Sequence, residues 1–111
     1  MNPRWEVNDY RGPQGARPIK EFLDGLSLEA KAKVYAALEM LAAEGNRLRF
    51  PKSRSLGGGL FEIRVMHPEG PFRILYCFQP GRKALLLHAF VKRTEQIPAG
   101  DLELARSRKP N

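Results

Sequence analysis

The stretch from Leu60 to Thr94 decides the fold of this chain: it reads LFEIRV at 60–65, FRILY at 72–76 and HAFVKRT at 88–94. Branched and aromatic apolar residues dominate these segments, as is typical of β-strands. Short links rich in proline and glycine separate them and indicate turns. We therefore predict an antiparallel meander of three strands, at about 60–66, 72–79 and 84–91.

Upstream of the meander, the apolar pattern predicts one strand and two helices. Residues 5–10 alternate apolar and polar side chains, which indicates a strand. Pro18 suits the first turn of a helix, and Ser27 is a good N-cap for a second helix that ends near Gly45. Residues 47–59 contain a proline and three consecutive glycines, so we predict a loop there.

Together these elements define an α+β protein. We expect an antiparallel sheet of about four strands with a helix pair packed on one face. A short C-terminal helix follows at about 99–109, and residues 1–111 form a single domain. The third meander strand is apolar on both sides, so we expect it at the centre of the sheet. The sheet face opposite the helix pair is expected to stay more open.

The composition points to a polyanionic partner. The chain has 19 Lys and Arg against 12 Asp and Glu, a net charge of +7, which favours nucleic acid or an acidic protein. A single cysteine, Cys77, excludes a disulfide within the chain and a cysteine-based zinc site, and we expect neither metal nor cofactor. No segment approaches the ~20 apolar residues of a membrane span, so we expect a cytoplasmic protein without a membrane partner.

Strand alternation predicts where the basic residues of the meander lie. Glu62 and Arg64 share one face of the first strand, and Arg73 lies on the opposite face from Phe72 in the second. Arg64 and Arg73 flank the first turn, so we expect them to be neighbours. Two ordinary roles stay open: Arg64 could pair with a carboxylate such as Glu62, and Arg73 could be a solvated edge residue. The pair at 92–93 could equally be an ordinary charged strand end.

Taken together, LFEIR, FRILY and HAFVKRT resemble the phage-derived, HigB-like branch of the RelE/ParE toxin superfamily. The resemblance extends over nearly the whole chain, including the helix pair and the basic C-terminus, and it implies a RelE-like fold. It also implies the toxin of a type II toxin–antitoxin pair. RelE-like members are mRNA interferases, endoribonucleases that cut mRNA in the ribosomal A site. The implied partners are the ribosome with its mRNA and a cognate antitoxin, often a helix-turn-helix protein.

The resemblance also assigns site residues. RelE-like toxins have basic residues on the first meander strand, on the second after its turn, and at the exit of the third. Here these places are held by Arg64, by Arg73 and by Arg93 or Lys92. The family's C-terminal tyrosine has no match, and Glu62 stands where a basic residue is usual. These departures leave open a ParE-like toxin that inhibits gyrase without cutting RNA, and a basic phage-derived binding protein without toxicity.

RNA cleavage without a metal requires activation of the 2′-hydroxyl, stabilisation of the phosphorane and protonation of the leaving oxygen. Guanidinium groups suit the second task because they donate paired hydrogen bonds to phosphate. Arg73 is the first candidate for it, with Arg64 and Arg93 as phosphate clamps. The candidates for proton transfer are Glu62, His88, Lys92 and His67. Glu62 would stay ionised between basic neighbours and make a poor acid, and His88 lies in an apolar strand where a buried structural histidine is the alternative.

Other basic residues could contact RNA phosphates independently of sequence. They are Arg47, Arg49, Lys52, Arg54, Lys92, Arg106, Arg108 and Lys109. Ordinary solubilising charge is the alternative for these residues. The same surface would accept the antitoxin through an acidic or amphipathic segment that masks the arginines. The glycines at 57–59 lack the lysine of a phosphate-binding loop and indicate a turn that leads into a strand.

Overall fold

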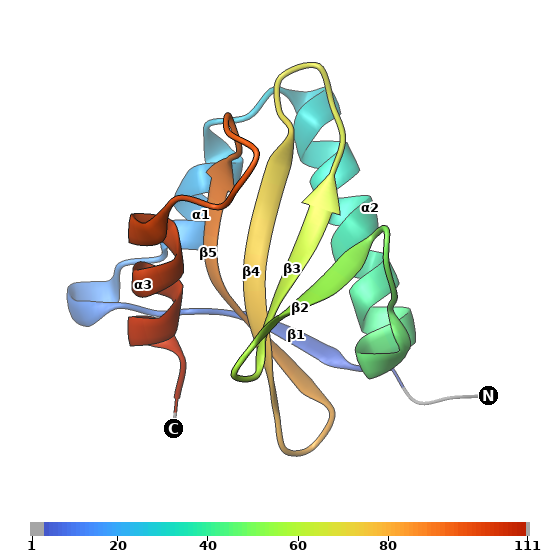
Figure 1. Ribbon diagram of the computed structural model, residues 1–111, viewed down its shortest axis with the longest axis vertical. Helices are drawn as coiled ribbons and strands as arrows, with labels where there is room; N and C mark the ends of the chain where they lie inside the picture. Colours follow the sequence, from blue (N-terminus) through green and yellow to red (C-terminus); the bar gives the residue numbers. More distant parts are fainter. Residues whose placement is uncertain (1–3, 111) are drawn as a thin grey trace.

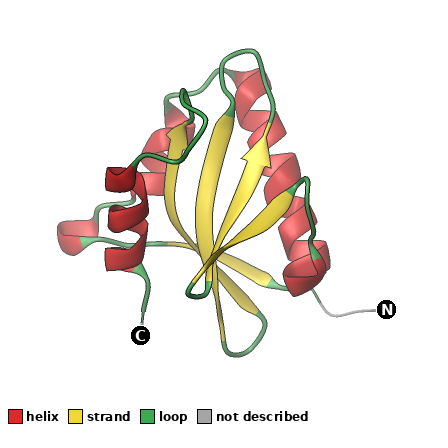
Figure 2. Ribbon diagram, in the orientation of Figure 1, coloured by secondary structure: helices red, strands yellow, loops and turns green. Residues whose placement is uncertain are grey.

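A computed structural model describes residues 4–110 as three layers, with helices on both sides of one sheet (Figure 1, Figure 2). In chain order the elements are β1 (Glu6–Asp9), the 3-10 turn η1 (Pro13–Gly15), α1 (Pro18–Asp24), α2 (Leu28–Glu44), the 3-10 turn η2 (Gly45–Arg47), β2 (Ser53–Gly57), β3 (Leu60–Val65), β4 (Phe72–Gln79), β5 (Lys83–Val91) and α3 (Ala99–Arg108). The three predicted meander strands and the C-terminal helix are confirmed. In the described part of the chain, no helix is long and apolar enough to cross a membrane.

The sheet has five strands in the order β1-β5-β4-β3-β2, not the four predicted, and two further predictions about it were wrong. β1 pairs in parallel with β5, which makes the sheet mixed rather than wholly antiparallel. β4, not β5, is the central strand. The parallel pairing arises because the helix pair returns the chain to the far edge of the sheet, from which the meander comes back to β1.

The fifth strand, β2, forms inside the segment that was predicted to be a loop. It pairs with β3 as a hairpin, with Arg54 opposite Glu62 and Ser55 opposite Phe61. Gly57, Gly58 and Gly59 all have positive φ and form the turn, as their sequence indicated. β2 lies at the edge of the sheet, and its sequence, SRSLG, does not alternate apolar and polar residues. The apolar pattern therefore did not predict a strand here.

One sheet face packs against α1 and α2, as predicted. Ser27 caps α2 by accepting a hydrogen bond at Oγ from the backbone N–H of Ala30 at 3.1 Å. The buried residues of this layer come from both helices and from β3, β4 and β5: Ile19, Leu23, Ala30, Val34, Leu41, Ile63, Val65, Phe72, Ile74, Tyr76, Ala84 and Leu86. The side chains that alternate with these residues along the strands therefore point to the opposite face of the sheet.

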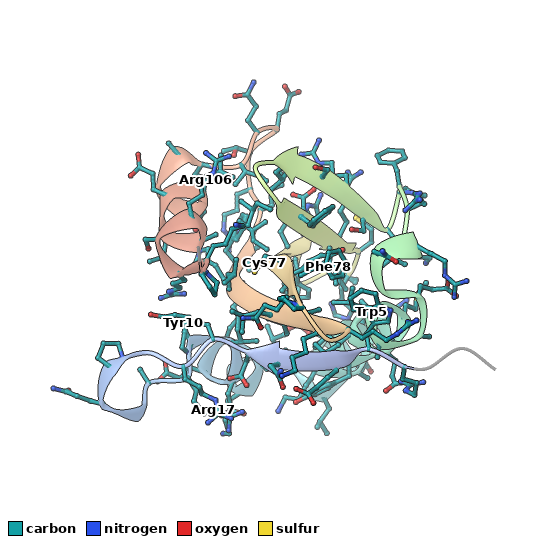
Figure 3. All side chains as sticks on the ribbon, turned by 90° about the horizontal axis from the view of Figure 1, so that it is seen from below. Trp5, Tyr10, Arg17, Cys77, Phe78 and Arg106 are labelled. Carbon is teal, nitrogen blue, oxygen red and sulfur yellow. The ribbon has the colours of Figure 1, made fainter. Side chains whose placement is uncertain are left out.

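The opposite face is less open than predicted, because α3 covers part of it. Figure 3 shows α3 on one side of the sheet and the helix pair on the other. Ala105 of α3 is fully buried in a second core, with Leu60, Leu75, Cys77, Leu87 and Phe90. α3 contacts β5, so the part of this face left for other functions lies toward β3 and β2.

Gly45 ends α2 with a backbone that only glycine adopts easily, at φ +54°. A Cβ on this residue would lie 2.0 Å from Nε1 of Trp5. We expect Gly45→Ala to lower the free energy of unfolding by about 1–3 kcal/mol through this clash, as measured by denaturant titration. Gly58→Ala is the matched control, because Gly58 has φ +61° but open space around it. Equal losses in the two variants would show that the contact with Trp5 contributes nothing.

Candidate functional site

The α3-side face of β2, β3 and β4 carries a compact group of charged side chains. The β3–β4 register places Arg64 directly opposite Arg73, which confirms that they are neighbours. Arg54 on β2 lies across from Glu62, and Lys92 directly follows β5. We call these five residues, Arg54, Glu62, Arg64, Arg73 and Lys92, the charged cluster. Four cations surround one carboxylate, so the cluster is strongly positive.

A buried ion pair lies at the base of the cluster. Glu62 is fully buried, and only 3% of Arg73 is exposed. Arg73 Nε lies 3.4 Å from Glu62 Oε2, yet neither atom has a hydrogen-bond partner among residues 4–110. Arg73 Nη1 donates to the carbonyl oxygen of Phe72 at 3.0 Å. The role of a solvated edge residue, left open for Arg73, is therefore wrong: it lies on the central strand, beneath the surface.

The more accessible cations of the cluster lie around this pair. Arg54 Nε donates to Glu62 Oε1 at 2.8 Å, and 43% of the Arg54 side chain stays exposed. Arg64 is half-buried, and its guanidinium lies 5.5 Å from the ring centre of Phe50. Arg54 and Arg73, rather than Arg64, thus make the described ion pairs with Glu62. Lys92 is half-buried, and its backbone N–H donates to the carbonyl oxygen of Pro71 at 2.8 Å.

Burial and like charge lower the pKa of two of these cations. Desolvation lowers the pKa of Arg73, and the neighbouring Arg64 and Arg54 act in the same direction against the attraction of Glu62. Desolvation likewise lowers the pKa of Lys92, helped chiefly by Arg73, while Glu62 opposes the shift. The electrostatic coupling shows that Lys92 belongs with the arginines. An added negative charge would relieve the repulsion among them.

The other predicted phosphate contacts are spread over the molecule. Arg106 of α3 lines a recess of about 280 Å³ together with Arg54, so it lies beside the charged cluster. Arg93 is exposed just beyond Lys92. Three residues lie in the segment before β2: Arg47, Arg49, whose Nη1 donates to the Asn46 carbonyl at 2.8 Å, and exposed Lys52. Arg108 and Lys109 lie at the C-terminal end of α3, where Arg108 Nη1 donates to the Leu87 carbonyl at 2.9 Å.

His88 is half-buried on the α3 side of the sheet and is not enclosed in the core. A β-bulge in β5 shifts the register next to the pair Leu75–His88. The side chains of Leu87 and His88 therefore both lie on the α3 side of the sheet. His88 Nε2 lies 2.6 Å from Asp101 Oδ1 in the first turn of α3. This contact ties α3 to the sheet. It engages one of the two imidazole nitrogens.

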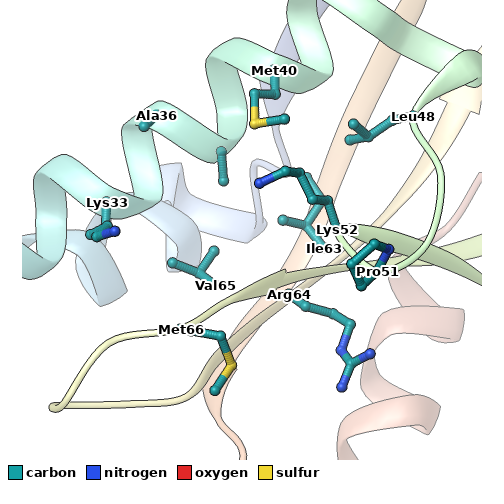
Figure 4. Close-up of a pocket in the computed structure, with 11 residues that line it drawn as sticks. Lys33, Ala36, Met40, Leu48, Pro51, Lys52, Ile63, Arg64, Val65 and Met66 are labelled. Atoms are coloured by element: carbon teal, nitrogen blue, oxygen red, sulfur yellow. The ribbon is translucent and has the colours of Figure 1, made fainter.

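A groove of about 410 Å³ lies on the other side of β3, between this strand, α2 and residues 48–52. Its walls are mostly apolar, and Lys33 and Lys52 lie among them. Figure 4 shows the Lys52 side chain reaching toward α2, whereas the guanidinium of Arg64 extends away from that helix. Sequence reasoning did not find this groove, because its residues belong to three separate elements.

Sequence reasoning also missed Phe50. The ring lies in the middle of the basic segment RLRFPKSR at 47–54 and is 68% exposed. An aromatic residue interleaved with basic residues was the available signal. Its contact with Arg64 places it at the border of the charged cluster.

This geometry defines an α+β protein with a strongly basic face. Accessible guanidinium and ammonium groups converge above a buried positive charge, an arrangement suited to phosphate groups. The family described as "Phage derived protein Gp49-like (DUF891)" matches residues 21–110. The chain therefore belongs to this phage-derived family, which is part of the RelE/ParE-like toxin family and is associated with toxin–antitoxin toxins. A search of curated proteins found no match.

Proposed function

We propose that this protein is the toxin of a type II toxin–antitoxin pair, with a RelE-like fold of the HigB-like branch, and that it cuts mRNA on the ribosome. The observation that supports the proposal is the charged cluster. It combines three accessible cations, Arg54, Arg64 and Lys92, with a fourth, Arg73, held beneath them. RNA phosphate is the ligand whose charge such a face fits best.

The burial of the cluster residues supports a division of roles. Arg54 and Arg64 contact the phosphates on either side of the scissile bond, and Arg93 and Arg106 extend this contact. Arg73 stabilises the phosphorane through its charge from beneath, in a site where few waters screen it. Glu62 keeps this buried guanidinium in place. It accepts one hydrogen bond from Arg54 and does not transfer protons itself.

Lys92 is the candidate for protonating the leaving 5′-oxygen, because it lies in the charged cluster, whereas Glu62 is buried and held by Arg54 and His88 contacts Asp101 of α3. Its neighbours and its burial lower its pKa from 10.5, which makes the ammonium a better acid. The ribosome, which aligns the RNA, would supply the remaining positioning, and the proton of the attacking 2′-hydroxyl would pass to solvent water.

The pH dependence of cleavage tests the role of Lys92. A proton donor must be protonated, so we expect the rate to fall as the pH rises through the pKa of Lys92, below 10.5. In Lys92→Arg the guanidinium stays protonated, so the alkaline fall should disappear while some activity remains. The rate is measured on purified ribosomes that carry a defined mRNA. An alkaline fall that persists unchanged in Lys92→Arg would exclude Lys92 as the acid.

The cognate antitoxin is the proposed protein partner. An acidic or amphipathic segment of a helix-turn-helix antitoxin would neutralise the repelling cations of the cluster and block RNA from them. Such a complex should form more slowly as the salt concentration rises, because screening weakens steering between opposite charges.

Induced expression of the wild-type protein in bacteria tests the proposal against its main alternative. We expect growth arrest with a rapid halt in protein synthesis and unchanged supercoiling of a reporter plasmid. Growth arrest with altered supercoiling and continued translation would indicate a gyrase inhibitor. Normal growth, with the folded protein accumulating, would indicate a basic binding protein without toxicity.

A further inference from the structure

The exposed ring of Phe50 is the feature that the proposed roles leave unexplained. Single exposed apolar residues are common on protein surfaces, so its position is what matters. The guanidinium of Arg64 lies 5.5 Å from the ring centre. A flat hydrophobic surface therefore borders the charged cluster and faces solvent over 68% of the residue.

A recess of about 300 Å³ lies beside this ring. Phe61 and Phe78 also line it, and their ring centres are 5.1 Å apart. Asn46 and Ser55 contribute polar groups to the same lining. Aromatic walls with a few hydrogen-bonding groups match the faces and edges of a nucleobase.

Arg54 joins the recess to the charged cluster. It contributes to the lining of the recess, and its Nε is hydrogen-bonded to Glu62 in the cluster. Cations that follow a nucleic-acid backbone beside rings that stack on bases are the usual design of sites for single strands.

We propose that the recess beside Phe50 holds one unpaired nucleobase of a single-stranded RNA, stacked on the Phe50 ring, while the adjoining phosphates bind Arg54 and Arg64. The proposal rests on the proposed function, because it takes RNA as the ligand. It adds a site for a base on the helix-pair side of the sheet edge at β2, where Phe50 and Arg54 border the charged cluster on the α3 side.

A tryptophan at this position reports stacking directly. Phe50→Trp is titrated with a single-stranded RNA oligonucleotide and with an oligonucleotide of the same length whose nucleotides are abasic. We expect the intact RNA to quench the fluorescence of the new tryptophan and the abasic strand to leave it unchanged. The wild-type protein, whose single tryptophan is Trp5, gives the background signal.

Affinity measurements on Phe50→Ala complete the test. Loss of one stacking contact should weaken RNA binding by about 5-fold to about 150-fold, equivalent to ~1–3 kcal/mol. Binding of inorganic polyphosphate should not change, because the cations remain. Tyr35→Ala is the matched control, since Tyr35 is an exposed aromatic residue, 52% accessible, on α2. Thermal unfolding confirms that each variant is folded.

The outcomes separate this proposal from the proposed function. If the wild type binds RNA and Phe50→Ala binds it equally well, the base site is wrong and the RNA function stands. If Phe50→Ala loses polyphosphate binding to the same extent, the ring supports the cations and does not stack on a base. If the wild type binds no RNA, alone or on ribosomes, the proposed function fails and the base site fails with it.

Discussion

Replacement of Glu62 by alanine is expected to lower the free energy of unfolding by about 3–5 kcal/mol, the usual cost of removing one partner of a buried ion pair. Glu62 is fully buried, and Arg73 is almost so. Without the carboxylate, the guanidinium of Arg73 would remain buried beside Arg54 and Arg64, with no compensating charge. Denaturant unfolding of the purified variant, followed by circular dichroism, measures the loss.

Three comparisons make this result specific. Glu62→Gln keeps the shape and an acceptor for Arg54 but removes the charge, so it should fall between the wild type and Glu62→Ala. Glu62→Leu combined with Arg73→Met should recover much of the stability, because both buried charges are gone. Asp24→Ala removes a carboxylate from the exposed pair Lys20–Asp24 and should change stability far less. A loss in Glu62→Ala below about 1 kcal/mol, typical of exposed pairs, would contradict the buried-pair account.

Replacement of Arg64 by alanine is expected to reduce mRNA cleavage by about 10²-fold, the usual effect of losing a contact that positions the reacting groups. Arg64 lies directly opposite Arg73 and is half-buried, so its guanidinium is both accessible and near the buried charge. Its removal should leave the fold intact, because no described ion pair depends on it. The cleavage rate is measured on ribosomes that carry a defined mRNA.

Arg11→Ala is the matched control for this variant. It removes the same charge from the chain, but Arg11 follows β1, at the opposite edge of the sheet from β2, and pairs with Asp9 at 3.6 Å. We expect Arg11→Ala to cleave at nearly the wild-type rate. Similar losses in the two variants would mean that net charge, and not the charged cluster, supports activity.

The fold was predictable wherever the apolar pattern was strong. The meander at 60–91 and the helix pair α1 and α2 follow from the apolar pattern and from caps such as Ser27. β2 could not be predicted in this way, because a mostly exposed edge strand does not need a row of apolar residues on one face. The parallel pairing of β1 with β5 depends on the path of the whole chain, which local patterns do not contain.

The sequence predicted which arginines of the site are neighbours, but not which of them are buried. Alternation along the strands correctly made Arg64 and Arg73 neighbours. It could not show that Arg73 is buried, because burial depends on β2 and on the chain that covers this face. Nor could it pair Glu62 with Arg54, since their contact requires the hairpin that was missed. Phe50 and the recess beside it join residues that are far apart in the sequence.

Mapping of mRNA 5′ ends in a translating extract tests the central claim most directly. We predict that the purified wild-type protein produces new 5′ ends within the translated region of a single mRNA, and that these ends disappear when translation is blocked before elongation. Arg64→Ala should yield few such ends at the same protein concentration. Inhibition of translation without new 5′ ends, or equal cutting in the absence of ribosomes, would contradict the account.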